Sequence, residues 1–326
     1  MSSYLLDTTL VRAHSEIYGV AKIRFHGDFQ PALAGDWSNY IRAAVKALRT
    51  RWEIAHGIEA KVTSDLPAAA GLSSSSALMT GFTIALLRAN GIEPTVEELM
   101  EVLPDGEQFV GTRGGGMDHA AVLASGAGCA LLVEFAPLRL KDVPIPDNWT
   151  FIVAHSLKTA EKAGAARERY NERRVAGQNA LKKLGVKSYC GLVERDSSRL
   201  SGEEARAFRH VLSEGRRVQD AVAALRRYDK NAFGELLCES HRSLRDDLRV
   251  SSRELDELVD LAMRNKALGA RMTGAGFGGC AVVFCEASER ERIAQALVDG
   301  FYSMRSGFDR AKHLIFAEPS AGALRV

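Results

Sequence analysis

One stretch of small residues decides the fold, and it reads Leu66-Pro67-Ala68-Ala69-Ala70-Gly71-Leu72-Ser73-Ser74-Ser75-Ser76-Ala77. Before it, apolar and polar residues alternate over 58–66, a period of two that predicts a half-buried strand. After it, residues 77–88 are apolar at helical spacing, and Gly91 ends that pattern. The order along the chain is therefore strand, loop of small residues, helix.

This loop is a candidate binding site for phosphate. The first N–H groups of a helix lack intrahelical partners and lie at the positive end of the helix dipole, so they attract anions. Gly71 permits close approach of the backbone, and the serine hydroxyls add hydrogen-bond donors or magnesium ligands. No lysine follows the glycine, which excludes a Walker A loop. An ordinary helix N-cap within a run of small residues is the alternative.

Length and composition indicate a globular protein of roughly two domains. The 326 residues are 46% hydrophobic and 26% charged, and the formal net charge of +2 gives no electrostatic case for nucleic acid or a membrane as partner. Five cysteines without a CxxC pair favour thiols in a reducing compartment. Because we find neither a signal peptide nor an apolar run of ~18 residues, we expect a cytoplasmic protein. The sequence does not determine an oligomeric state, and we expect a monomer.

Two acidic residues are candidates for chemistry. Asp118 follows three glycines, a tight backbone that can deliver its carboxylate to one place, and both a helix N-cap and an acid/base role are open for it. Glu107 lies near the end of a helix predicted over 95–109, where a solvated carboxylate is the default. Upstream, Ser38 is a candidate N-cap for a helix to residue 48, and Trp37 is either a core aromatic or a stacking platform.

The second half of the chain changes in character near residue 157. Residues 163–262 are mostly charged helix, and the segment 240–247 has a polar density unusual for a bare surface. Gly274, Gly276 and Gly279 match the dinucleotide fingerprint GxGxxG literally, but a strand follows them where that fingerprint requires a helix. This excludes a dinucleotide-dependent oxidoreductase and favours a loop whose backbone packs closely against another element or a phosphate.

Three segments together resemble the GHMP small-molecule kinases. Residues 67–77 are similar to the family's second motif, Pro-x-x-x-Gly-Leu-Ser-Ser-Ser, and residues 271–280 to its third. Gly-Gly-Met-Asp at 115–118, Ser-His-Arg-Ser-Leu-Arg-Asp-Asp at 240–247 and Trp-Ser-Asn-Tyr at 37–40 are similar to the versions found in the galactokinase branch. The resemblance runs from about residue 35 onward.

The resemblance implies an α+β fold of two domains. These are an N-terminal ATP-binding domain like ribosomal protein S5 domain 2 over 1–157, and a ferredoxin-like C-terminal domain over 158–326. It also implies ATP-dependent phosphorylation of the anomeric hydroxyl of a galactose-like sugar. The alternatives are a kinase for another sugar and a sugar- or nucleotide-binding sensor with little or no catalysis.

Site residues follow from the resemblance. The ATP phosphates would be bound by Gly71, Leu72, Ser73, Ser74, Ser75 and Ser76. Ser75 and Glu107 would hold Mg²⁺, and Trp37 would approach the adenine. Asp118 would take or orient the proton of the sugar hydroxyl, with Tyr170 and Gly115 near the sugar. The site would be closed by Gly274, Gly276 and Gly278.

The sequence departs from the family pattern at three places. A fourth serine, Ser76, extends the serine loop, residues 71–76. The family's first motif, Gly-Arg-x-Asn-x-Ile-Gly-Glu-His-x-Asp-Tyr, normally precedes the region matching residues 1–30 and is absent, and residues 1–30 contain short apolar stretches expected to form edge strands of a sheet. We expect an N-terminally shortened form, with upstream sequence that encodes the motif. His119 stands where the family has a glutamine after the catalytic aspartate.

Overall fold

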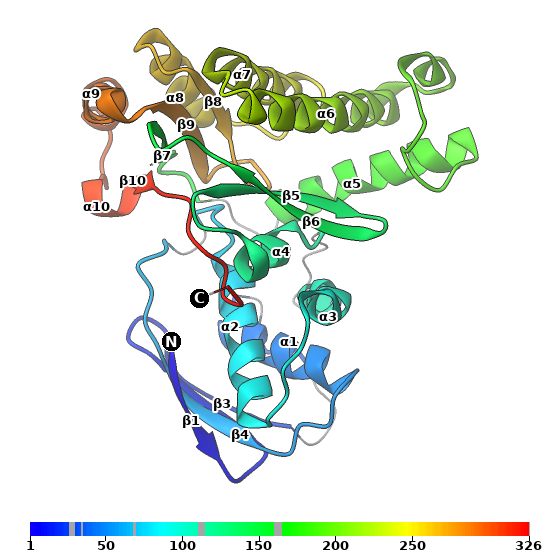
Figure 1. Cartoon of the computed structure of the whole chain (residues 1–326), viewed down its shortest axis with the longest axis vertical. Helices are drawn as coiled ribbons and strands as arrows, with labels where there is room; N and C mark the ends of the chain where they lie inside the picture. Colours follow the sequence, from blue (N-terminus) through cyan, green and yellow to red (C-terminus); the bar gives the residue numbers. More distant parts are fainter. Residues whose placement is uncertain (26–29, 34, 68–69, 110–114, 160–164, 326) are drawn as a thin grey trace. The chain divides into compact units, whose positions relative to one another are not determined.

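The computed structural model describes residues 1–25, 30–33, 35–67, 70–109, 115–159 and 165–325. They form two compact units, shown with their element labels in Figure 1. Unit 1 comprises Met1–Ala68, Ser73–Asp142 and Pro319–Val326. Unit 2 comprises Ala69–Leu72 and Val143–Glu318.

A four-stranded sheet of order β1-β4-β2-β3 forms one side of unit 1 (Figure 1). Its strands are β1 (Ser2–Leu6), β2 (Leu10–Ser15), β3 (Gly19–Arg24) and β4 (Gly57–Val62). β4 runs antiparallel to β1 and parallel to β2, and β2 runs antiparallel to β3. The prediction of strands before residue 30 is confirmed. The expectation that all of them are edge strands is wrong for β2, because β4 pairs along its free side.

Among the described residues, four helices and a two-stranded ribbon accompany this sheet, and the ribbon's last residues, Val143 and Pro144, belong to unit 2. These elements are α1 (Ser38–Arg49), α2 (Ser74–Ala89), α3 (Val96–Phe109), α4 (Met117–Ala124), β5 (Cys129–Phe135) and β6 (Leu138–Pro144). Apolar side chains of α1, α2, α3 and the inner face of the sheet form one buried core, which includes Ile41, Phe82, Leu103 and Ile58. The alternation predicted for the strand over 58–66 therefore places its apolar face inward, although the strand ends at Val62.

Local hydrogen bonds fix where α3 and α1 begin. At α3, the partners are Thr95 and Glu98. Glu98 N donates to Thr95 Oγ1 at 3.2 Å and Thr95 N donates to the Glu98 carboxylate at 2.9 Å, the reciprocal pair that defines a capping box. At α1 the prediction of Ser38 as N-cap is wrong. Its own N–H donates to Oδ1 of Asp36 at 2.8 Å, so the aspartate supplies the oxygen at this helix start.

Unit 2 is built on a second four-stranded sheet, of order β10-β7-β9-β8, in which all neighbours are antiparallel. Its strands are β7 (Trp149–His155), β8 (Gly269–Met272), β9 (Cys280–Glu286) and β10 (Leu314–Ala317). The glycine-rich segment 273–279, here called the glycine loop, joins β8 to β9. A strand does follow these glycines, as the sequence predicts.

Helices account for most of the rest of unit 2. They are α5 (Ala165–Leu184), α6 (Gly202–Arg226), α7 (Lys230–Asp246), α8 (Arg253–Arg264), α9 (Arg290–Leu297) and α10 (Arg310–His313), with short turns at Glu194–Arg199, Ala287–Glu289 and Val298–Tyr302. The core packs Leu255 and Leu258 of α8 against Ile152 and Val283 of the sheet. In the part of the chain that the structure describes, we find no helix with the length and apolarity needed to cross a membrane.

All five cysteines are free thiols. Cys280 and Cys285 on β9 are buried, and this burial raises the pKa of Cys280 to about 12 and that of Cys285 to about 11. Cys190 is exposed, and Cys129 and Cys238 are half-buried. The prediction of thiols rather than disulfides is confirmed.

Candidate active site

The residues predicted for the site are divided between the two units. Those of unit 1 are Trp37, Ser73, Ser74, Ser75, Ser76, Glu107, Gly115 and Asp118. Those of unit 2 are Gly71, Leu72, Tyr170, Gly274, Gly276 and Gly278. Ala68, Ala69 and Gly114, which belong to the motifs, lie outside the described residues.

The serines begin helix α2 in unit 1. Ser73 is at the N-cap position with a left-handed φ of 58°, and its side chain accepts no capping hydrogen bond. Ser74, Ser75 and Ser76 form the first turn. The N-cap alternative is thus correct for the position of Ser73 but not for its hydroxyl, which is not used to cap the helix.

A buried polar cluster lies behind this first turn. Ser76 Oγ donates to Oε1 of Glu107 at 2.5 Å, and Nε2 of His119 lies 3.6 Å from the same oxygen. Nδ1 of His119 is 3.3 Å from Oγ1 of Thr80. Glu107 is only 5% exposed, and the other three side chains are fully buried. The default expectation of a solvated Glu107 is therefore wrong.

Glu107 also acts on a neighbouring aromatic residue. The pKa of Tyr40 is raised, first by burial and then by the negative charge of Glu107. The sequence pairs Glu107 with the serine loop only through the family resemblance, and neither Thr80 nor His119 was singled out as its companion. A spacing signal exists only for Thr80, which comes one helical turn after Ser76, so that the two share one face of α2. The place of His119 next to Asp118 carries no such signal, because neighbouring residues of a helix do not face the same way.

Asp118 is in the first turn of α4 and does not cap it. The N-cap residue is Gly116, with a φ of 84°, and Asp118 is half-buried two residues later. A Cβ on Gly116 would lie 3.1 Å from Cε of Met100 and from Cγ of Pro104, so this position needs glycine for both conformation and space. The N-cap alternative for Asp118 is excluded. Gly115 is exposed, and no described atom would contact a Cβ there.

Trp37 packs within unit 1. Its ring stacks on Tyr18 with 6.3 Å between centroids and 28° between planes, and it contacts the core of this unit while remaining half-buried. The core interpretation of Trp37 is confirmed, and one part of the ring stays accessible. The predicted contact with adenine stays a prediction.

In unit 2, the backbone of Gly71 packs directly against the glycine loop. Both Gly71 and Gly274 have left-handed φ values, of 75° and 74°. A Cβ on Gly274 would lie 2.8 Å from the carbonyl oxygen of Gly71, closer than Cβ atoms come to other atoms in proteins. Ala70 beside it is buried against Val153 and Cys280. The expected close approach of backbone is therefore present between these two segments.

The rest of the glycine loop is held by backbone hydrogen bonds on two sides. Phe277 N donates to the carbonyl of Val250 at 2.6 Å, and Gly279 N donates to that of Lys158 at 2.8 Å. A Cβ on Gly276 would lie 2.1 Å from the Val250 oxygen, and one on Gly278 would lie 2.7 Å from the Lys158 oxygen. Each glycine therefore marks a contact between two backbones.

Helix α5 contributes Tyr170 and several arginines to unit 2. The guanidinium of Arg169 lies 5.5 Å from the ring centroid of Phe277 at the apex of the glycine loop. Nε of Arg173 donates to the carbonyl of Leu248 at 3.0 Å, and its side chain is only 19% exposed. Arg173 is therefore part of a packed contact rather than of a solvated helix face, while Tyr170 is half-buried on the same helix.

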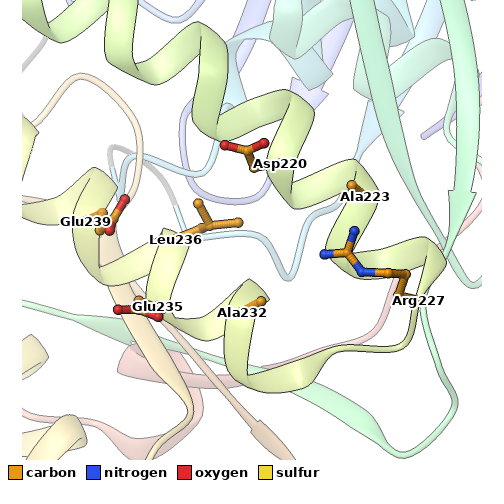
Figure 2. A pocket seen from close by; sticks show the side chains of 7 residues that line it. All are labelled: Asp220, Ala223, Arg227, Ala232, Glu235, Leu236 and Glu239. Carbon is orange, nitrogen blue, oxygen red and sulfur yellow. The ribbon is translucent and has the colours of Figure 1, made fainter.

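A separate pocket lies between α6 and α7, with a volume of about 240 Å³ (Figure 2). It is lined by Asp220, Ala223, Arg227, Ala232, Glu235, Leu236 and Glu239. Among the described residues of the chain, those predicted for the site are all absent from this lining. The pocket is therefore distinct from the unit 2 part of the candidate site.

Comparison with known families identifies the class. Residues 39–157 match the GHMP kinases N terminal domain, and residues 221–303 match the GHMP kinases C terminal model. The serine loop, Glu107 and Asp118 lie in the first region, and the glycine loop lies in the second.

Individual relatives narrow the class. The galactokinase of Chloroflexus aurantiacus is 38% identical over 286 residues, which are 83% of this chain and 71% of that protein. The galactokinase of Streptomyces coelicolor is 33% identical over 98% of this chain and 84% of its own length. A crystal structure of Lactococcus lactis galactokinase complexed with galactose matches with a TM-score of 0.87 and 25% identity, covering 99% of this chain and 86% of that one. The chain belongs to the galactokinase family of GHMP kinases.

Proposed function

We propose that this chain transfers the γ-phosphoryl group of ATP to the anomeric hydroxyl of galactose, giving galactose 1-phosphate and ADP. The observation that carries the proposal is the 33% identity to a curated galactokinase along 98% of this chain. The match in structure to a galactokinase that holds galactose, with a TM-score of 0.87, supports it independently of the local motifs.

On the nucleotide side, the phosphates of ATP would be bound by residues 71–76 at the start of α2. The hydroxyl of Ser73 makes no capping bond, which leaves it available to a ligand. Free N–H groups in the first helical turn complement phosphate charge. The backbone of the glycine loop, at Gly274, Gly276 and Gly278, would close this side, and Trp37 would lie toward the adenine.

The residues proposed for Mg²⁺ suit that ion chemically. Mg²⁺ prefers oxygen ligands and is commonly held by one or two carboxylates together with substrate phosphates and water. Glu107 provides a buried carboxylate whose position is fixed by the 2.5 Å hydrogen bond from Ser76, and Ser75 provides a hydroxyl in the same first turn of α2 as Ser76. When bound, the ion would neutralise charge on the phosphates.

On the sugar side, Asp118 would accept the proton of the anomeric hydroxyl. The anomeric oxygen of the sugar would at the same time form the new bond to the γ-phosphorus, and the bond from that phosphorus to ADP would break. Phosphoryl transfer needs mainly positioning and charge stabilisation, so a single well-placed carboxylate is sufficient for the proton. Gly116 fixes where α4 begins and thereby where the Asp118 carboxylate lies. Tyr170 and Gly115 would contact the sugar.

The test measures ADP release by the purified full chain with ATP, Mg²⁺ and galactose, and identifies the product by phosphorus NMR, which distinguishes an anomeric phosphate from other esters. Asp118→Asn should lower kcat by about 10²- to 10⁴-fold with little change in ATP binding. Glu97→Gln is the matched control, because it removes one carboxylate from the first turn of α3 at an exposed position.

Each outcome decides a part of the proposal. Turnover with glucose but not galactose would reject the substrate and keep the kinase. ATP binding without turnover of any sugar would favour the sensor alternative. Full activity in Asp118→Asn would remove this carboxylate from the chemistry.

A further inference from the structure

One face of the polar segment 240–247, at the end of α7, is buried, while Arg242 and Asp246 on it are exposed. Ser240 Oγ donates to Oε1 of Glu214 on α6 at 2.6 Å, and Ser243 Oγ donates to Oδ2 of Asp247 at 3.1 Å. Ser240, His241 and Ser243 are all buried. The polar density that the sequence indicates is therefore a set of internal contacts, and neither the fold nor the proposed reaction accounts for His241.

His241 contacts the strand that leads into the glycine loop. Its Nδ1 accepts a hydrogen bond from the backbone N–H of Met272, the last residue of β8, at 3.3 Å. An imidazole nitrogen that accepts cannot carry a proton, so the proton of the neutral ring is on Nε2. That nitrogen lies 3.2 Å from Oδ1 of Asp256 on α8, which favours this tautomer.

The same aspartate leads to the apex of the glycine loop. Oδ1 of Asp256 also accepts from Ser251 Oγ at 2.6 Å, and Ser251 follows Val250 directly. The carbonyl of Val250 accepts the hydrogen bond of Phe277 at the apex. One imidazole is thus connected to the loop at two points, directly at Met272 and through Asp256 and Ser251 at Phe277.

We propose that neutral His241 is a positioning residue that fixes the glycine loop at its entry and its apex, and so sets the affinity of the chain for ATP. The second half of this statement rests on the proposed function, which gives the glycine loop its role beside the phosphates. The first half stands on the contacts alone.

Burial, rather than the charges around the ring, favours the neutral form that the contacts need. Asp256 and Asp260 face the ring from α8, Arg245 faces it from its own helix, and the contact from β8 is the backbone N–H of Met272. Burial is the largest influence and lowers the pKa of His241, while the two carboxylates oppose that shift. Protonation of Nδ1 would remove the acceptor for Met272, so acid should release the loop entry.

The experiment measures amide hydrogen exchange over residues 271–279 of the full chain without ligand. His241→Leu should speed exchange of the Met272 amide and the glycine loop about tenfold, the effect of one lost hydrogen bond. His241→Asn should restore most of the protection, because its Oδ1 can replace Nδ1 as acceptor. His210→Leu is the matched control, since His210 is also buried but contacts Ser243 instead of β8.

Acidification adds a readout that a merely structural role would not move. As the pH is lowered, protection of the Met272 amide from exchange should decrease in the native chain relative to His241→Asn, because asparagine does not titrate. Asp256→Asn should lower the midpoint of that fall, because it removes the carboxylate that favours the protonated ring. This comparison decides the proposal even where His241→Leu does not fold.

The kinetic arm tests the link to ATP. His241→Leu should raise KM for ATP about tenfold and leave KM for galactose within about twofold. Unchanged exchange over 271–279, no rescue by asparagine, or an unmoved midpoint in Asp256→Asn would each overturn the positioning role. A chain that turns over no galactose would refute the proposed function, whereas the exchange result would still decide the role of His241.

Discussion

Replacing Gly276 with alanine gives a direct test of how the glycine loop is built. The residue has a φ of 85°, and a Cβ there would lie 2.1 Å from the carbonyl oxygen of Val250 and 2.9 Å from its carbonyl carbon. Both atoms are backbone, so no side-chain rotation can relieve the contact. Either the loop or the segment around residue 250 must move.

The expected cost has two parts. A left-handed backbone costs a non-glycine residue about 1–2 kcal/mol. Forcing two backbones apart adds about 1–3 kcal/mol, as for other overpacked sites. Gly185 separates the two, because its φ is 75° but no described atom lies within 4 Å of its Cβ position, so Gly185→Ala carries only the conformational part.

Urea unfolding of the two variants measures the difference. Trp149 reports on unit 2, since it is 6% exposed and packs on Phe233 and Phe284. Gly276→Ala should lose about 1–3 kcal/mol more unfolding free energy than Gly185→Ala. Under the proposed function, KM for ATP should rise in Gly276→Ala alone.

Equal losses in the two alanine variants would refute the reasoning. They would mean that the backbone contact with Val250 is absent in solution and that the glycine serves only the turn. An unchanged KM for ATP in a folded Gly276→Ala chain would separate the loop from nucleotide binding while leaving the packing argument intact.

Three other predictions follow from buried polar groups. Ser76→Ala should lower the unfolding free energy by about 1.5–3 kcal/mol, because it leaves the buried Glu107 carboxylate without its donor, whereas Ser303→Ala at an exposed position should change it little. Native Cys280 should resist alkylation by iodoacetamide while the exposed Cys190 reacts, and equal rates would contradict the burial that raises the pKa of Cys280 to about 12. Acid should destabilise the chain through histidines whose pKa is lowered by burial. These histidines are His155, His210 and His241. As the pH falls below 6.5, the ordinary pKa of histidine, the unfolded chain binds more protons than the native chain. The free energy of unfolding, measured from about pH 8 to about pH 5, should therefore decrease as the pH falls below 6.5. A free energy that does not change with pH would count against neutral buried rings.

Local patterns were sufficient for the elements that carry the site. Periodicity predicted β4, α2 and the strand after the glycines, because alternation and helical spacing are set by which face is buried. The capping box of Thr95 and Glu98 was predictable because its two partners are only three residues apart in the sequence. Local patterns were not sufficient at α1, where Ser38 and Asp36 are equally suitable by residue type to supply the capping oxygen and only the observed backbone selects Asp36.

Contacts between elements were not predictable from one sequence. Glu107 lies near the end of a helix, where a lone carboxylate is normally solvated. Its carboxylate is nevertheless buried and accepts a hydrogen bond from Ser76, which lies 31 residues earlier. Nothing local to either residue indicates the other. The family resemblance placed Glu107 beside the serine loop, and the structure adds His119 and Thr80 to the same cluster.

For segment 240–247, the sequence predicts that polar groups are buried but does not identify their partners. Its serines, histidine and charged residues sit on a helix that must bury one face, and buried polar groups need partners. That reasoning predicts that partners exist, but it cannot name them, because Glu214, Asp256 and Met272 belong to three other elements. Once the fold brings them together, chemistry restricts the answer sharply: a histidine that accepts from a backbone N–H on one side and faces a carboxylate on the other must be neutral, with its proton on Nε2. The direction of the predicted pH effect follows from that tautomer, because protonation of Nδ1 removes the acceptor for the N–H of Met272.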